Sequence, residues 1–268
     1  MHTTVIGETV HFYKELSSTQ TLAVNLAERK LRENAHGTVI IAERQRCGKG
    51  RIDERKWISP KGGIWLSIIL KPKIRVTQTT LLPFIAALAV GDTIKEKTHL
   101  NSRIKWPNDI MIQDKKVSGI VVDTSIDAKT INYAVIGIGI NANIDAAKLS
   151  SYVSRSRGGI NSKCFGITSL KNELSGKNVN IIVIMQSFLE KLEYYYFQLE
   201  KEGSKKIITK LKERSETVGN SVLVKQDKET FEGVAIDIDA DGILLVKTPE
   251  GNINEVASGE IIVIRNRV

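Results

Sequence analysis

The sequence predicts an α+β protein, in which a mixed, largely antiparallel sheet with helices precedes a small C-terminal all-β barrel. Three observations support this class. Helical and strand patterns are interspersed through the first part of the chain, the strands there are rich in β-branched residues, and short alternating strands fill the remainder. We therefore expect a larger domain over residues 1–216 and a smaller one over residues 217–268.

The first helix is expected over residues 19–33, because apolar residues recur there at helical spacing and hydroxyl side chains precede it as caps. A second helix is expected over residues 81–96. Pro83 lies in its first turn, where the missing N–H costs little. Further helices are expected over residues 181–201 and 203–216.

The strands of the larger domain are expected where apolar and β-branched residues form short runs. They are residues 38–43, 64–70, 103–106, 110–112, 117–124 and 133–140. The last two should pair with each other. Polar stretches over residues 44–62 and 145–165 predict loops, and we expect the second loop to be mobile.

After Val218, short alternating strands are separated by turn residues such as Asp241-Gly242. The expected strands are residues 221–225, 230–237, 243–247 and 261–264. An all-β segment of about 50 residues is typical of a small barrel.

The positive charge of the chain is concentrated in one segment. The net charge is +9, from 39 basic and 30 acidic residues. Residues 44–61 hold seven basic and two acidic residues, a net +5, whereas residues 218–268 hold five basic and nine acidic residues, a net −4. This distribution favours a compact anion site over a broad nucleic-acid-binding face.

Other features exclude several classes of protein. Two cysteines are too few for a disulfide framework, and the four histidines lack the spacing of zinc ligands. No apolar run approaches the length of a membrane span, and the N-terminus lacks the core of a secretion signal. We expect a cytoplasmic protein that does not bind a membrane.

The basic segment QRCGKGRIDERKW begins at Gln45. Gly48 and Gly50 flank Lys49, and Arg51 follows. Glycines let the backbone approach a ligand, and the cations can bind carboxylate or phosphate. The segment lacks the Gly-Lys-Ser/Thr of a phosphate-binding loop. Taken alone, it is also typical of a solvated basic loop.

Three further motifs follow in order. KWPND at residues 105–109 can orient a polar ligand or form a plain turn. KKVSG at 115–119 can point a lysine into a pocket or end an exposed hairpin. GIGIN at 137–141 places two glycines within a strand. Glycine weakens a strand, so its presence indicates either that a ligand approaches the backbone closely or that two strands cross tightly there.

Together, and in this order, these segments resemble the biotin–protein ligase family over nearly the whole chain. AERQRCGKGRIDERKWISPKGGIWLSIIL is similar to the family's Gln…Gly-Arg-Gly-Arg…Trp-x-Ser-Pro-x-Gly motif. KWPNDI, KKVSGIVVD and VIGIGINAN follow at family-like spacing, and the acidic β domain resembles the family's C-terminal barrel. The resemblance implies a class II synthetase-like, biotin/lipoate-ligase catalytic domain over residues 1–216.

The resemblance also implies a two-step reaction. Biotin and ATP, with Mg²⁺, form biotinyl-5′-AMP and pyrophosphate, and a lysine of a biotin carboxyl carrier protein then accepts the biotin. The enzyme needs no covalent intermediate, which agrees with the lack of a Ser/His/Asp or Cys/His pattern. The family often pairs through sheet edges near the active site, so a homodimer is one arrangement that the resemblance allows.

Site residues follow from the resemblance in three sets. Those implied to bind biotin are Ser18, Thr19, Gln20, Gln45, Gly48, Lys49, Gly50, Arg51, Lys116 and Gly119. Those implied to bind ATP are Arg51, Arg55, Trp57, Asn108 and Asn141. Arg51 and Lys116 are the implied catalytic residues, Lys105 is a supporting residue, and residues 154–164 resemble a segment that orders over the adenylate.

The chain departs from the family pattern in four places. Gln20 replaces the usual Asn, and Lys49 replaces the first Arg of the basic motif. The stretch between Arg51 and Trp57 is one residue longer than the bacterial pattern. The catalytic pattern begins within about 17 residues of Met1, so we expect neither a helix-turn-helix domain nor DNA binding.

Two alternatives remain at this point. A lipoate/octanoate–protein ligase shares the catalytic fold, but the Arg-Arg-x-Ser-Gly-Gly-Gly segment usual in those enzymes is absent and they lack this barrel. A non-catalytic nucleic-acid-binding protein would need a basic barrel, whereas this one is acidic.

Overall fold

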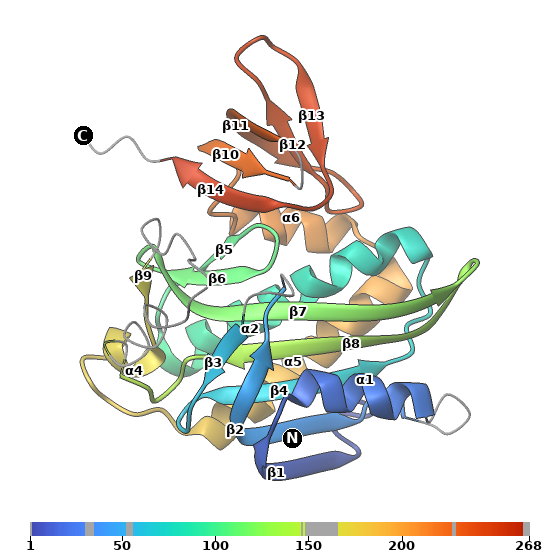
Figure 1. Cartoon of the computed structure of the whole chain (residues 1–268), viewed down its shortest axis with the longest axis vertical. Coiled ribbons are helices and arrows are strands. Elements are labelled where there is room, and N and C mark those ends of the chain that lie inside the picture. Colours follow the sequence, from blue (N-terminus) through green and yellow to red (C-terminus); the bar gives the residue numbers. More distant parts are fainter. Residues whose placement is uncertain are drawn as a thin grey trace.

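The computed structural model describes residues 2–29, 35–51, 56–145, 147, 166–226 and 229–264. A large, twisted sheet forms the centre of the molecule, and a smaller sheet adjoins it beside α6 (Figure 1). The α+β class, with a mixed and largely antiparallel large sheet, is confirmed. No helix in the described part of the chain is long and apolar enough to span a membrane.

The large sheet has nine strands. Seven follow the order β1-β2-β4-β8-β7-β6-β5, with β3 paired to β2 and β9 paired to β7. Only β1–β2 and β7–β9 are parallel among the described pairings. The strands are β1 (Val10–Leu16), β2 (Val39–Lys49), β3 (Lys56–Ser59), β4 (Ile64–Leu70), β5 (Arg103–Lys105), β6 (Asp109–Ile112), β7 (Lys115–Asp127), β8 (Thr130–Ile140) and β9 (Gly166–Ile167).

Helices cover both faces of this sheet (Figure 1). The helices are α1 (Thr19–Arg29), α2 (Leu82–Thr98), α4 (Leu170–Glu173), α5 (Ile181–Glu202) and α6 (Lys205–Glu213), with a 3-10 turn η1 (Val76–Leu81) before α2. Ile69 and Val135 pack with α1, whereas their strand neighbours Ile68 and Ile136 belong to the core that contains α2 and α5. Because side chains alternate along a strand, β4 and β8 can be buried on both faces.

The C-terminal unit is an antiparallel sheet in the order β13-β12-β11-β10-β14. Its strands are β10 (Ser221–Lys225), β11 (Thr230–Ile238), β12 (Leu244–Lys247), β13 (Ile253–Val256) and β14 (Glu260–Ile264). Trp106 links it to the large sheet, since its Nε1 donates to Gly242 O at 3.0 Å and its backbone N donates to Thr217 Oγ1 at 3.0 Å. Its core residues are continuous with those of α2.

Most predicted elements are confirmed, but the loop expected over residues 44–62 is wrong in two parts. β2 continues through Lys49, and residues Lys56–Ser59 form β3, paired antiparallel with it. The polar side chains misled the prediction, because a strand that borders a cavity needs no apolar run. The expectation for 145–165 and the end of the helix over 19–33 lie largely outside the described residues.

Besides β3, three strands were not predicted. β1 carries mostly exposed side chains, β13 carries a mixture of exposed and buried ones, and β9 has only two residues. Each therefore lacks the apolar alternation that identifies a strand in a sequence. β1 and β13 lie at the ends of their sheets, where one side needs no partner.

A buried carboxylate fixes the N-terminal segment to α5. Glu193 is 7% exposed, and its Oε1 accepts from Thr4 N at 2.7 Å and Thr4 Oγ1 at 3.2 Å. Its Oε2 accepts from Val5 N at 2.8 Å and Ile6 N at 2.7 Å. Four donors satisfy this charge, so it stabilises the segment instead of opposing burial.

We predict that Glu193→Gln lowers the free energy of unfolding by roughly 2 kcal/mol, because the amide turns an N–H group toward backbone donors. Denaturant-induced unfolding measures this. Glu190→Gln is the matched control, since Glu190 lies one turn earlier and accepts from His2 N at an exposed site. Equal losses in both variants would contradict a special role for Glu193.

Candidate active site

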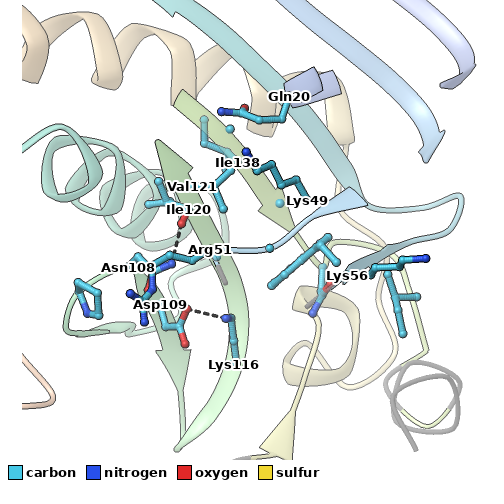
Figure 2. A pocket seen from close by; sticks show the side chains of 18 of the residues that line it. Gln20, Lys49, Arg51, Lys56, Asn108, Asp109, Lys116, Ile120, Val121 and Ile138 are labelled. Atoms are coloured by element: carbon cyan, nitrogen blue, oxygen red, sulfur yellow. Dashed lines mark hydrogen bonds and ion pairs between the residues drawn. The ribbon is translucent and has the colours of Figure 1, made fainter. Parts of the chain in front are cut away.

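One cavity of about 260 Å³ collects the conspicuous motifs of the sequence (Figure 2). It lies over the large sheet on the face that carries α1. The start of α1, the ends of β2, β3, β7 and β8, and the first residues of β14 contribute to its wall. Segments that are distant in sequence therefore meet in one site.

The floor of the cavity is made of glycines on two paired strands. Gly119 of β7 and Gly139 of β8 are cross-strand partners. A Cβ at Gly139 would lie 2.6 Å from Trp57 Nε1, and one at Gly119 would lie 2.8 Å from the same indole ring. A Cβ at Gly137 would lie 2.3 Å from Gln20 Oε1. The glycines of the GIGIN motif thus leave room for the side chains of Trp57 and Gln20, and the alternative of a tight strand crossing is not observed.

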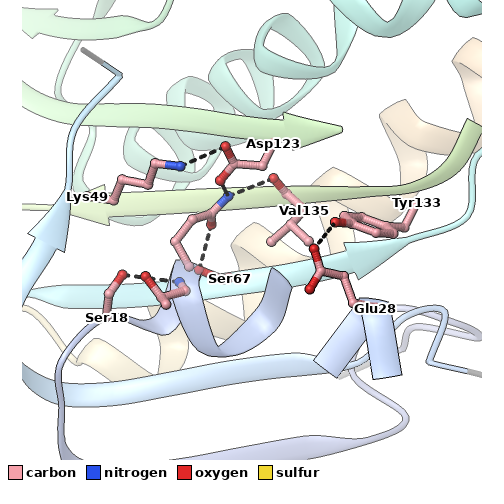
Figure 3. Close-up of polar contacts among 9 residues, drawn as sticks. Ser18, Glu28, Lys49, Ser67, Asp123, Tyr133 and Val135 are labelled. Carbon is pink, nitrogen blue, oxygen red and sulfur yellow. Dashed lines mark hydrogen bonds and ion pairs between the residues drawn. The ribbon is translucent and has the colours of Figure 1, made fainter. Parts of the chain in front are cut away.

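Among the cations that line the cavity, Lys49 and Arg51 of the basic segment and Lys116 of β7 each have an oxygen partner. Lys49 Nζ lies 2.9 Å from Asp123 Oδ1 (Figure 3), and Lys116 Nζ lies 2.5 Å from Asp109 Oδ1. Arg51 Nη2 donates to Gly259 O, in the turn before β14, at 2.7 Å. Lys116 also lies 5.0 Å from the centre of the Trp57 ring, within cation–π range.

Polar side chains line one end of the cavity. Gln45 Oε1 accepts from Thr19 N at 2.7 Å and Thr19 Oγ1 at 3.1 Å, and its Nε2 donates to Ser59 Oγ at 2.8 Å. Ser18, Thr19 and Gln20 are all nearly buried at the start of α1. This end can bind a compact polar group that has been removed from water.

Two buried asparagines also line the cavity. Asn108 donates from Nδ2 to Ile120 O at 2.6 Å, and Asn141 donates from Nδ2 to Thr168 O at 3.0 Å. Their side chains are held by backbone carbonyls. Lys105, the expected supporting residue, is also buried and lines the cavity.

The structure brings together nearly all the predicted site residues that it describes. Lining the cavity are Ser18, Thr19, Gln20, Gln45, Lys49, Gly50, Arg51, Trp57, Asn108, Lys116, Gly119 and Asn141. Gly48 lies behind the wall, where a Cβ would meet Trp57 O at 2.5 Å and Ser59 Oγ at 2.7 Å. Arg55 and residues 154–164 lie outside the described residues.

Several residues of the site were not predicted. They are Lys56, Ser67, Asp109, Gly137, Gly139, Gly166, Ile167, Glu260, Ile261 and Ile262. Asp109, Gly137 and Gly139 belong to motifs already singled out, so a signal for them existed. Glu260 to Ile262 come from the acidic C-terminal sheet, where no local pattern indicates a ligand site.

The described residues contain no group of three or more His, Cys, Asp or Glu side chains that could hold a metal ion. The cavity instead combines basic residues, amides and hydroxyls. It is suited to bring two anionic groups together, because the cations offset their repulsion and a partly enclosed site strengthens each interaction.

Sequence comparisons agree with this geometry. The biotin/lipoate A/B protein ligase family matches residues 12–141, and the biotin protein ligase C terminal domain matches residues 217–263. The bifunctional ligase/repressor BirA of Bacillus subtilis (strain 168) is 31% identical over 262 residues, covering 97% of this chain and 76% of the relative. BirA of Escherichia coli (strain K12) is 28% identical over 234 residues, covering 87% of this chain and 68% of the relative.

A solved structure is similar along the full length. The biotin protein ligase from Aquifex aeolicus, in complex with biotin and ATP, has a TM-score of 0.73 and 28% sequence identity. The match covers 97% of this chain and 100% of that one. With both domains matched in order and a relative 31% identical along almost the whole sequence, this chain belongs to the biotin protein ligase family.

Proposed function

We propose that this chain is an ATP-dependent biotin–protein ligase, which forms biotinyl-5′-AMP and then transfers biotin to a lysine of a biotin carboxyl carrier protein. The observation that carries the proposal is the convergence of Lys49, Arg51 and Lys116 on one cavity that buried polar side chains also line. The similar protein from Aquifex aeolicus binds both biotin and ATP. Neither a lipoate ligase nor a nucleic-acid-binding protein is favoured by these comparisons.

In the first step, an oxygen of the biotin carboxylate attacks the α-phosphorus of ATP, and pyrophosphate leaves with the electron pair of the broken P–O bond. Both reactants are anionic, so they repel each other. Arg51 and Lys116 offset this repulsion and stabilise the charge that develops on the phosphate oxygens. Lys49 adds a third positive charge at the same cavity.

In the second step, the neutral amine of the acceptor lysine attacks the acyl carbon of the mixed anhydride. The C–N bond forms, the C–O bond to AMP breaks, and the amine loses a proton to water. AMP is already a good leaving group, so the enzyme's role is to orient the two reactants and shield the anhydride.

We assign the polar side chains of Ser18, Thr19, Gln20 and Gln45 to the biotin head. We assign Lys49, Gly50 and Gly119, which line the cavity, to biotin as well, with Gly48 supporting them from behind the wall. We assign Trp57, Asn108 and Asn141 to ATP, with Arg55 as a further residue of that set. Arg51 and Lys116 then lie where the carboxylate and the α-phosphate meet.

We expect Mg²⁺ to bind together with the triphosphate of ATP. Mg²⁺ usually keeps several waters and is bound through one or two carboxylates together with substrate phosphates. Asp109 is a carboxylate that already lines the cavity. The homodimer and the cytoplasmic location stay predictions.

ATP–pyrophosphate exchange tests the function directly. We predict biotin-dependent exchange that lipoate and octanoate do not support at the same concentration. Exchange with lipoate or octanoate but not with biotin would assign the chain to the other branch of the family. No exchange with any of these acids would reject the adenylation proposal.

We predict that Arg51→Ala and Lys116→Ala each slow single-turnover adenylation at least roughly tenfold, equivalent to about 1.4 kcal/mol of transition-state stabilisation. Lys115→Ala is the matched control, because Lys115 is adjacent on β7 but pairs with Glu173 at 2.7 Å and does not line the cavity. Normal single-turnover rates in both cavity variants would show that the assigned roles are wrong.

We predict that Gly139→Ala raises the KM for ATP about tenfold, because the new Cβ displaces the Trp57 indole. Steady-state kinetics at saturating biotin measure this. Gly91→Ala in α2 is the control, since its Cβ would meet only Ser102 Oγ at 3.3 Å and the Arg214 guanidinium at 3.7 Å. An unchanged KM for ATP would place the nucleotide away from Trp57.

A further inference from the structure

The segment between α6 and the C-terminal sheet runs parallel to β5, at one end of the large sheet. Ile104 N donates to Arg214 O at 2.8 Å, and Glu216 N donates to Ile104 O at 2.8 Å. Ser215 lies opposite Ile104 in a parallel bridge. Residues 214–217, which we call the joining segment, therefore cover the edge of β5 that does not face β6.

Side chains hold the joining segment in this place. At its start, Arg214 Nη1 lies 2.5 Å from Asp92 Oδ1 of α2. Nearer its end, the buried Ser215 Oγ accepts from Thr217 N and from Val218 N, each at 3.0 Å. The course of the backbone is thus fixed just before the C-terminal sheet begins.

Thr217 extends the contact with β5 through its side chain. Backbone N–H groups alternate in direction along a strand, so Trp106 N faces the same side as Ile104 N. Thr217 Oγ1 accepts from Trp106 N at 3.0 Å. Thr217 is fully buried and Trp106 is nearly so, and the hydroxyl therefore satisfies an N–H group that is removed from water.

Trp106 belongs to a run of residues that forms one wall of the cavity. All of residues 105–109 line the cavity, whereas Thr217 does not. The far part of the run is held by β7, because Asn108 Nδ2 donates to Ile120 O at 2.6 Å and Ile120 N donates to Asn108 O at 3.1 Å. Thr217 therefore holds one end of this wall and β7 holds the other.

We propose that Thr217 is a positioning residue for ATP, because its hydroxyl fixes Trp106 N and thereby the place of Asn108. This inference rests on the proposed function, which assigns Asn108 to ATP. Without the hydroxyl, a buried N–H group would lose its acceptor, and the wall would shift toward another partner. Small displacements of positioning groups are costly, since about 1 Å can slow a reaction roughly 100-fold.

Thr217→Val tests this role, because valine keeps the shape of threonine but has no acceptor. In ATP–pyrophosphate exchange at saturating biotin, the KM for ATP should rise at least about fivefold. The Kd for biotin, measured by isothermal titration calorimetry, should change less than about twofold. Partial unfolding would lower kcat by reducing the active fraction but would leave the KM for ATP unchanged. Thr217→Ser, which keeps the hydroxyl, should restore this KM to within about twofold.

The matched control is Thr98→Val, which makes the same substitution at a buried threonine at the end of α2. Thr98 Oγ1 also accepts from a backbone N–H group, that of Leu100 at 3.3 Å, but Thr98 does not line the cavity. Its KM for ATP should match that of the wild-type protein.

Arg103→Met provides the test if Thr217→Val does not fold. The Arg103 side chain is 56% exposed, and its Nη2 donates to Ser215 O at 2.8 Å, so its loss loosens the joining segment from a surface position. The KM for ATP should then rise at least about twofold, with an unchanged Kd for biotin. A wild-type KM in that variant would overturn the inference.

The remaining outcomes separate the two proposals. A folded Thr217→Val with the wild-type KM for ATP, an equal rise in the Kd for biotin, or no recovery in Thr217→Ser would overturn the role of Thr217 while leaving biotin adenylation intact. A wild-type protein without biotin-dependent exchange would overturn the proposed function and this inference with it. A selective rise in the KM for ATP, restored by serine and absent in Thr98→Val, would support the inference.

Discussion

Positive charges that lie in one cavity repel each other, and oxygen atoms from the surrounding strands and turns hold these cations in place. Lys49 and Arg51 come from the basic segment and Lys116 from β7, and each is held by an oxygen from another part of the chain. Asp123 and Asp109 lie on β7 and β6, whereas Gly259 lies in the turn between β13 and β14. Anchoring each cation costs little entropy once the strands are paired, so the site is arranged before an anion arrives.

The C-terminal sheet is part of this arrangement as well as a separate unit. Gly259 O orients Arg51, Glu260 to Ile262 line the cavity, and Trp106 joins the two sheets through Gly242. Trp106 belongs to the same KWPND segment as Asn108 and Asp109. A displacement of the small sheet would therefore disturb the same short segment that supplies the nucleotide side of the cavity.

The sequence predicts the buried parts of the fold well, because β4, β7, β8, α2 and α5 are rich in apolar residues. It does not predict the polar continuation of β2 or the exposed strand β1, since their pairing depends on neighbours and not on local pattern. The same holds at the site. Motif order identifies Gln45, Asn108 and Lys116, but Ser67 and Ile261 have no local signature and reach the cavity only through the fold.

The anchoring of the N-terminal segment by Glu193 bears on where a label or a fused domain can be joined to the protein. Residues 4–6 are fixed to α5, which packs on the face of the sheet opposite the cavity, whereas β14 passes along the cavity wall itself. β1 and β14 are separated in Figure 1. A label, a fused domain or a solid support joined ahead of residue 2 would precede the segment held by α5, whereas one joined after β14 would follow a strand whose first residues line the cavity.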